Sequence, residues 1–215
     1  MSVSIDVRGE QMQLFAERAA YWGRASTLLV ADPHFGKAAT FRAAGIPVPR
    51  GTTADGLVRL DALLARTGAR RIVFLGDFLH AREGRAAATL EAVRAWRESH
   101  DEVEMLVVRG NHDRHAGDAP PELGIASVNG PVVETPFVFA HHPAVSDAGY
   151  VLAGHLHPSV DLTGPGRQHA RLPCFWLAST GAVLPAFGDF TGLSSVTPTV
   201  GDRVFVVAGS DVMEL

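Results

Sequence analysis

The chain has 215 residues, of which 47% are hydrophobic, and its 19 basic and 23 acidic residues give a formal net charge of −4. The length predicts a single domain over residues 1–215, and the charge excludes a nucleic-acid binder that works through a broadly basic surface. The one cysteine, Cys174, excludes a disulfide framework and a cysteine-rich zinc site. The first eleven residues carry no basic segment followed by an apolar run, and no apolar stretch reaches the about 18 residues of a membrane span. We therefore expect a cytoplasmic protein that contacts no membrane.

Short apolar runs rich in Val, Leu, Ile and Phe recur along the chain, and each ends in polar residues, which is the pattern of buried strands. The five clearest runs span residues 27–31, 71–75, 103–108, 136–140 and 150–153. Between the first three, residues 53–66 and 86–99 carry apolar side chains at helical spacing. The first half therefore predicts an α/β sheet with parallel crossovers. Further strands are expected near 159–163, 172–178 and 203–207, which favours a second sheet packed on the first.

Each of the five clear runs is followed by residues that can bind a metal ion. In chain order these are Asp-Pro-His at 32–34, Gly-Asp at 76–77, Gly-Asn-His-Asp at 110–113, His-His-Pro at 141–143 and Gly-His-Leu-His at 154–157. Carboxylates, imidazoles and an amide oxygen suit Mn²⁺, Fe, Zn²⁺ or Ni²⁺. Because open α/β sheets collect their chemistry at the carboxyl ends of strands, we expect these residues to meet in one site. The glycines before Asp77, Asn111 and His155 are expected to allow tight turns.

The order DxH, GD, GNHD, H, GHxH resembles the motif set of the calcineurin-like metallophosphoesterases, and the resemblance spans Asp32 to His157. The flanking segments 35–37, 41–49 and 110–114 are similar to those of the bacterial ligase-associated DNA-damage-response endonucleases of that superfamily. The resemblance implies a four-layer α-β-β-α sandwich with two packed mixed sheets. It also implies two divalent metal ions, with Mn²⁺ as the first choice and Fe, Zn²⁺ or Ni²⁺ as alternatives.

The same resemblance implies a role for each motif residue. The implied metal ligands are Asp32, His34 and His157 for one ion, Asn111, His141 and His155 for the other, and Asp77 as the bridge between them. A hydroxide shared by the two ions would attack phosphorus. His112 would stabilise the transition state or protonate the leaving oxygen, and Asp113 would orient His112. His141 and His142 compete for one position: alignment as HxP favours His141, which leaves His142 to support the ligand or face the substrate.

Several residues beside the motifs are candidate substrate contacts. They are Lys37, Arg42, Arg50, His80, Arg114 and His142. Arg42 and Arg50 bracket a Gly-Ile-Pro-Val-Pro loop, which either grips the phosphates of a polynucleotide or joins a strand to a helix. His80 is interpreted equally well as a substrate contact or as a surface-loop histidine.

The resemblance therefore predicts a metal-dependent phosphodiesterase, an endonuclease that hydrolyses DNA in repair beside a DNA ligase and a helicase. One alternative is a phosphodiesterase or phosphatase for cyclic nucleotides or small phosphoesters. Another is a non-catalytic binding scaffold, which the presence of His112 and all seven implied ligands disfavours. The pattern predicts no particular oligomeric state.

Overall fold

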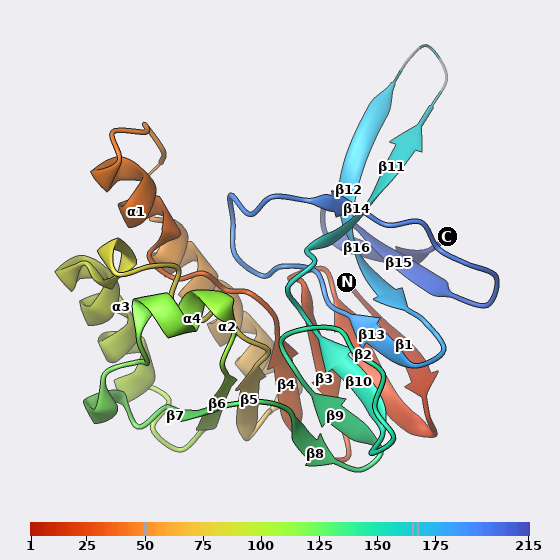
Figure 1. Ribbon diagram of the computed structural model, residues 1–215, viewed down its shortest axis with the longest axis horizontal. Coiled ribbons are helices and arrows are strands. Elements are labelled where there is room, and N and C mark those ends of the chain that lie inside the picture. Colours follow the sequence, from red (N-terminus) through yellow and green to blue (C-terminus); the bar gives the residue numbers. More distant parts are fainter. Residues whose placement is uncertain (50, 165, 167) are drawn as a thin grey trace.

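The computed structural model describes residues 1–49, 51–164, 166 and 168–215. Two mixed sheets pack face to face, and the helices form a layer on the outer side of the first sheet (Figure 1). The first sheet has the order β1 (Ser2–Val7), β2 (Glu10–Phe15), β3 (Ala19–Trp22), β4 (Thr27–Val30), β5 (Arg71–Phe74), β6 (Glu104–Val108) and β7 (Ala126–Val128). Strands β1 to β4 are antiparallel neighbours, whereas β4 to β7 run parallel.

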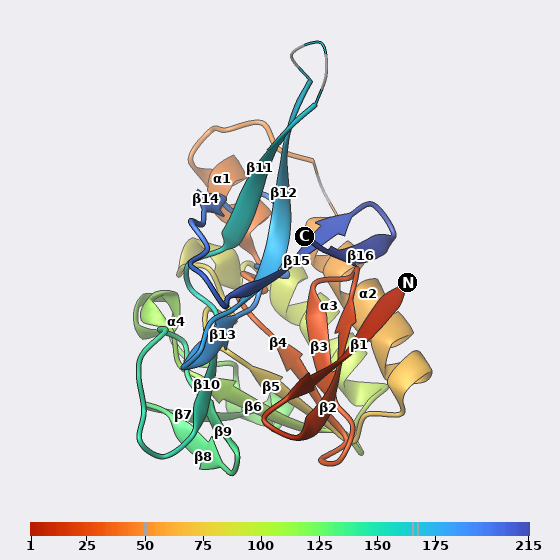
Figure 2. The same cartoon turned by 90° about the vertical axis from the view of Figure 1, so that its right-hand side faces the viewer.

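The second sheet has a more mixed topology. Its order is β14 (Ser194–Ser195), β11 (Pro158–Thr163), β12 (His169–Leu177), β13 (Gly181–Val183), β10 (Tyr150–Ala153), β9 (Phe137–Phe139) and β8 (Val132–Glu134). In addition, β15 (Arg203–Ala208) pairs with β12 and with β16 (Asp211–Glu214). The β11–β12 hairpin projects from the body of the molecule (Figures 1 and 2).

The helices cover the first sheet because they connect its parallel strands. They are α1 (Lys37–Ala43), α2 (Thr52–Thr67), α3 (Ala87–Glu98) and α4 (Asn111–Ala116), with short 3-10 turns η1 (Glu83–Arg85) and η2 (Pro121–Leu123). The leucines of α2 lie on its buried face. Gly68 caps the C-terminus of α2: its φ of 63° is left-handed, and its backbone N–H donates a hydrogen bond to the Leu64 carbonyl. The predicted helices over 53–66 and 86–99 are thereby confirmed.

The central strands of the first sheet are buried on both faces, which explains their unbroken apolar runs. In β4, Leu28 and Val30 pack into the core beneath the helices, whereas Leu29 packs into the core between the sheets. That second core is completed by Phe137 and Phe139 of β9 and by aromatic side chains of β12 and β15. The two sheets are thus joined along a continuous apolar layer.

The first three strands are absent from the sequence prediction. They form an antiparallel meander in which buried side chains such as Met12 and Leu14 alternate with exposed Gln11 and Gln13. This two-residue alternation is the mark of a strand with one exposed face, and it contains no long apolar run.

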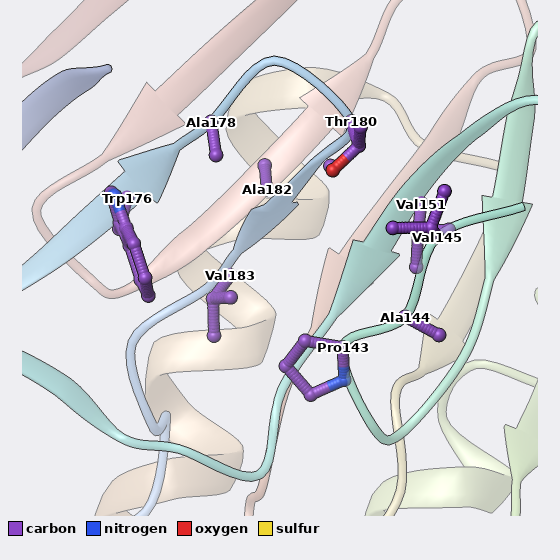
Figure 3. A pocket seen from close by; sticks show the side chains of 10 residues that line it. Pro143, Ala144, Val145, Val151, Trp176, Ala178, Thr180, Ala182 and Val183 are labelled. Atoms are coloured by element: carbon purple, nitrogen blue, oxygen red, sulfur yellow. The ribbon is translucent and has the colours of Figure 1, made fainter. Parts of the chain in front are cut away.

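The α/β class and the two packed mixed sheets are confirmed, but the outer layer over the second sheet differs from the expected helices. Among the described residues, the connection 140–149 between β9 and β10 lies on that side. It borders a shallow apolar cavity of about 270 Å³ whose lining includes Pro143, Val145, Val151, Trp176 and Val183 (Figure 3). The physical reason is topology: β11–β12, β12–β13 and β15–β16 are antiparallel pairs, which short turns can join without a helix, and the parallel pair β9–β10 is connected by the 140–149 loop in place of a helix. None of the described helices has the length and apolar composition that a bilayer crossing demands.

Candidate metal centre

The five predicted motifs meet where β4, β5, β6, β9 and β10 end. Five of the predicted ligands adopt a left-handed backbone: Asp32 (φ 50°), His34 (47°), Asp77 (51°), His155 (70°) and His157 (49°). The described chain has nine non-glycine residues with positive φ, so more than half of them are at this site. Such a conformation costs of order 1 kcal/mol or more per residue and persists only where the surrounding structure enforces it. The fold therefore places these side chains at an energetic cost.

Three glycines allow the ligand loops to approach closely. A Cβ at Gly76 would overlap the His141 ring, one at Gly110 would overlap the Asp77 carboxylate, and one at Gly154 would contact the Asp32 carboxylate. The expectation of a tight turn holds for Gly76, whose φ is 87°. The expectation that a Cβ would hinder the chain holds at all three positions, although Gly110 is extended and Gly154 is not among the positive-φ glycines of the described chain. At those two positions glycine is needed because a carboxylate occupies the space of a side chain.

One group of side chains consists of Asp32, His34 and His157, whose ligand atoms lie within 4.8 Å of one another. Asp32 is fully buried, and its Oδ2 lies 3.7 Å from His157 Nε2. His157 Nδ1 donates a hydrogen bond of 3.0 Å to the Gly192 carbonyl, which leaves Nε2 directed at Asp32. Asp32 Oδ1 and His34 Nε2 are both buried without a hydrogen-bond partner in the described structure.

A second group forms around His141. His141 Nε2 lies 2.9 Å from Asn111 Oδ1 and 3.1 Å from His155 Nδ1, while His141 Nδ1 donates to the Leu75 carbonyl at 3.0 Å. His141 is buried, whereas its neighbour His142 is exposed and lies against the rings of His141 and His155. The geometry therefore favours His141 over His142 as the ligand of this group.

Asp77 lies between the two groups. Its Oδ2 is 3.8 Å from His34 Nε2 in the first group, and its Oδ1 is 3.6 Å from His141 Nε2 in the second. Asp77 Oδ1 also accepts a hydrogen bond from the His112 amide at 2.9 Å. One carboxylate oxygen thus faces each group, which is the arrangement that a bridging ligand requires.

The donor set fits a pair of divalent cations. Two buried carboxylates and two buried atoms without partners would be costly unless a positive group satisfied them. Burial, together with the nearby Lys37 ammonium, lowers the pKa of His34 far below its ordinary value. Burial and His141 likewise lower the pKa of His155. These imidazoles are therefore neutral, which is the form that binds a metal.

The predicted contact between Asp113 and His112 is wrong. Asp113 is 4% exposed and accepts hydrogen bonds from the amides of Gly110 at 2.8 Å and of Phe78 at 2.9 Å. These hydrogen bonds link the segment that follows Asp77 to the residue that precedes α4. His112 Nδ1 instead donates a hydrogen bond of 2.7 Å to the His80 carbonyl.

Two of the predicted substrate contacts, His80 and Lys37, lie close to the predicted metal ligands. His80 lies inside the cluster: its Nδ1 is 3.2 Å from His34 Nδ1, and its ring stacks on His112 at a centroid distance of 4.6 Å. Lys37 is half-buried, and burial lowers the pKa of its ammonium group. The nearby carboxylates of Asp77 and Asp32 raise this pKa but offset the effect of burial only in part.

The three predicted arginine contacts also differ. Arg114 is exposed on α4, close enough to His142 to lower the pKa of that imidazole after the larger effect of burial. Arg42 donates to the Pro49 carbonyl at 3.1 Å and so closes the 44–49 loop on itself. Arg50 lies outside the described residues.

The sequence prediction missed the segment 186–192, which completes the site. The Gly188 amide donates to the Asp32 carbonyl at 3.1 Å, and the Gly192 carbonyl accepts from His157. This segment has no motif, and its contribution is made by backbone groups, so side-chain patterns carry no signal for it.

Comparison with known proteins relates the chain to a solved nuclease structure. No family model matches the chain, and no curated protein matches its sequence. A crystal structure of the Pseudomonas putida nuclease MPE is 42% identical, with a TM-score of 0.88 and 100% of both chains covered. A phosphoesterase from E. coli, Yfce, is far more distant, with 13% identity, a TM-score of 0.41, and 88% of this chain and 97% of that chain covered.

Proposed function

Since this chain belongs to the metallophosphoesterase family that includes the Pseudomonas putida nuclease, we propose that it is a metal-dependent phosphodiesterase that hydrolyses DNA phosphodiester bonds. The observation that carries this proposal is the convergence of two ligand groups on Asp77, within a fold shared over the whole length of that nuclease. The proposal covers residues 1–215 as one catalytic domain. It also includes Mn²⁺ as the metal and a cytoplasmic role in DNA repair with a ligase and a helicase.

We assign the two ion positions to the groups described above. Asp32, His34 and His157 would hold one ion, and Asn111, His141 and His155 the other, with Asp77 shared. When bound, two divalent ions supply positive charge to the phosphoryl oxygens and lower the pKa of an attacking water. The carbonyls of Leu75 and Gly192 fix the rings of His141 and His157, because each accepts a hydrogen bond from the Nδ1–H of the ring and leaves Nε2 free to bind an ion.

We assign His112 to the leaving oxygen. Its Nδ1 proton is held by the His80 carbonyl, so the opposite nitrogen, Nε2, is available to carry a second proton to the alkoxide that departs. Stacking on the His80 ring fixes the plane of the imidazole. Lys37 and Arg114 supply positive charge beside the ligands and are the candidates for contacts to neighbouring phosphates.

A substrate panel tests the proposal. Purified protein is offered plasmid DNA, single-stranded DNA, RNA, cyclic nucleotides and phosphate monoesters, each with Mn²⁺, Fe²⁺, Zn²⁺ or Ni²⁺ and after chelation. We expect metal-dependent cleavage of DNA and of bis-p-nitrophenyl phosphate. Preferential turnover of cyclic nucleotides or monoesters would overturn the DNA proposal, and no turnover of any phosphoester with any of the four metals would overturn the enzyme.

Variants of the shared ligand complete the test. Asp77→Ala should lower turnover of bis-p-nitrophenyl phosphate by about 100-fold or more, because it removes the group common to both ion positions. The matched control is Asp61→Ala, a carboxylate on the helix layer that bonds Trp96 and not the ligands. Full activity of Asp77→Ala would refute the assignment of the bridge.

A further inference from the structure

Phe190 stands apart from the other phenylalanines of the chain. Of the eleven, nine are buried in the two cores, and Phe41 is half-buried beside Lys37 and His80. Phe190 is 47% exposed. Its ring makes no aromatic or cation contact of the kind that Phe41 makes within the described residues. A half-exposed ring buries only part of its apolar area, so Phe190 contributes less to folding than the nine buried rings.

The segment around Phe190 is bonded to the metal centre on both sides. Two residues before it, the Gly188 amide donates to the Asp32 carbonyl at 3.1 Å. Two residues after it, the Gly192 carbonyl accepts a bond of 3.0 Å from His157. Because consecutive Cα atoms are about 3.8 Å apart, the Phe190 Cα lies within about 8 Å of the Cα atoms of both glycines. The backbone that carries the exposed ring therefore lies beside the metal centre.

Two arginines hold the residues that precede Phe190. Asp189 lies 3.8 Å from an Arg18 nitrogen and 3.5 Å from an Arg59 nitrogen. Arg59 in addition donates to the Phe187 carbonyl at 2.8 Å and covers the Phe187 ring at 4.4 Å. These contacts fix residues 187–189, so the backbone directly before Phe190 is held in place.

The backbone of Phe190 is strained. Its φ is 57°, in the left-handed region that a bulky side chain rarely adopts and that glycine occupies without cost. The predicted ligands Asp32, His34 and Asp77 share this conformation, as do Arg8, Arg18 and Ser26 outside the site. Phe190 is 47% exposed, so burial of its ring offsets the strain only in part. A glycine would be more stable here, so the aromatic side chain itself is what the position provides.

We propose that Phe190 is a substrate-binding residue that stacks on a nucleobase next to the scissile phosphate, an inference that rests on the proposed nuclease function. A phenyl ring can stack on any base, because every base has a π-face, so the contact would add affinity without sequence preference. A base inside a duplex is already stacked on both faces. The contact therefore requires a base that is unpaired or displaced, and it favours cleavage in single-stranded segments.

Three variants separate stacking from a structural role. Phe190→Leu keeps an apolar side chain without a π-face, Phe190→Trp keeps the π-face, and Phe190→Gly removes the side chain and relieves the strained backbone. Val58→Ala is the matched control, since Val58 is an exposed apolar residue on α2. The measured quantity is kcat/KM for a single-stranded oligonucleotide divided by kcat/KM for methyl p-nitrophenyl phosphate, both with Mn²⁺.

We expect this ratio to fall about 5- to 150-fold in Phe190→Leu and Phe190→Gly, the range for loss of one stacked base, and to stay near the wild-type value in Phe190→Trp and Val58→Ala. Phe190→Gly should at the same time raise the melting temperature. A wild-type ratio in Phe190→Leu would overturn the inference. So would a lower melting temperature in Phe190→Gly, because the residue would then be structural.

An abasic substrate distinguishes failure of this inference from failure of the nuclease proposal. The wild type should cleave an oligonucleotide with abasic positions around the cleavage site less efficiently than the intact one, and Phe190→Leu should discriminate less between the two. If the wild type cleaves methyl p-nitrophenyl phosphate but no polynucleotide, the nuclease proposal itself is wrong. If the wild type cleaves the intact and the abasic oligonucleotide, and Phe190→Leu shows the same preference between these two substrates as the wild type, only the stacking assignment is wrong.

Discussion

The carboxylate of Asp113 ties together the loops that carry Asp77 and Asn111, and its removal should cost stability. In Asp113→Ala, the buried amides of Gly110 and Phe78, now bonded at 2.8 and 2.9 Å, lose their acceptor. The third bond, from the Leu79 amide, is long at 3.3 Å and contributes less.

An unpaired buried donor costs about 1–3 kcal/mol, so two of them give about 2–6 kcal/mol. Burial raises the pKa of Asp113, which means that keeping its charge inside already has a cost that the variant avoids. We therefore expect the lower part of that range, about 2–3 kcal/mol. For a domain of this size, each kcal/mol shifts the melting temperature by about 2–4 °C, which gives a fall of about 4–12 °C.

The assay is thermal unfolding of Asp113→Ala and Asp113→Asn beside the wild type, all treated with chelator so that metal loss does not contribute. The second measurement is kcat on bis-p-nitrophenyl phosphate with metal restored, below the unfolding transition. We expect kcat to fall far less than in His112→Ala, because His112 bonds the His80 carbonyl and not Asp113. An unchanged melting temperature together with a kcat as low as that of His112→Ala would refute this reasoning and restore direct pairing of Asp113 with His112.

Four further predictions follow from the site and the core. His112→Ala should retain its metal content, measured by atomic absorption, and lose about 10²- to 10⁴-fold in kcat, as expected for an acid catalyst; loss of metal would make His112 a ligand. Gly154→Ala should lower both metal content and melting temperature, because a Cβ there meets the Asp32 carboxylate; unchanged metal content would contradict that. The double variant Lys37→Ala, Arg114→Ala should bind single-stranded DNA with a shallower slope of log affinity against log salt, by about 1.4, because each lost phosphate contact removes about 0.7. A slope equal to that of the wild type would exclude both residues as phosphate contacts. Burial raises the pKa of the Cys174 thiol to about 12, so iodoacetamide at pH 8 should label it only after unfolding, and rapid labelling of the folded protein would show that β12 opens.

The metal centre was predictable because its side chains follow directly after the most apolar strands. A continuous run such as 71–75 is visible in the sequence since β5 is buried on both faces, and Asp77 is placed by the end of that strand. Parallel strands then bring their carboxyl ends to one edge, so the ligands converge without any further information.

Other features depend on contacts between distant segments and leave no local pattern. The contacts that favour His141 over His142 come from the Leu75 carbonyl, directly after β5, and from Asn111, the first residue of α4. The partner of Asp113 is a set of backbone amides, and backbone groups are the same in every sequence. The β1–β3 meander is signalled only by alternation, which is a weaker pattern than an apolar run.

Burial of β4, β5 and β6 on both faces has a consequence for how the enzyme loses activity. The amides of strands enclosed by two cores should exchange with solvent only when the whole domain opens, so we expect these strands to be its slowest-exchanging unit. Asp32 and Asp77 lie in loops that directly continue β4 and β5, and Asn111 begins α4 shortly after the end of β6. Heating should therefore not melt the ligand shell ahead of the rest. Release of the ions and collapse of the fold are expected to occur in one cooperative step.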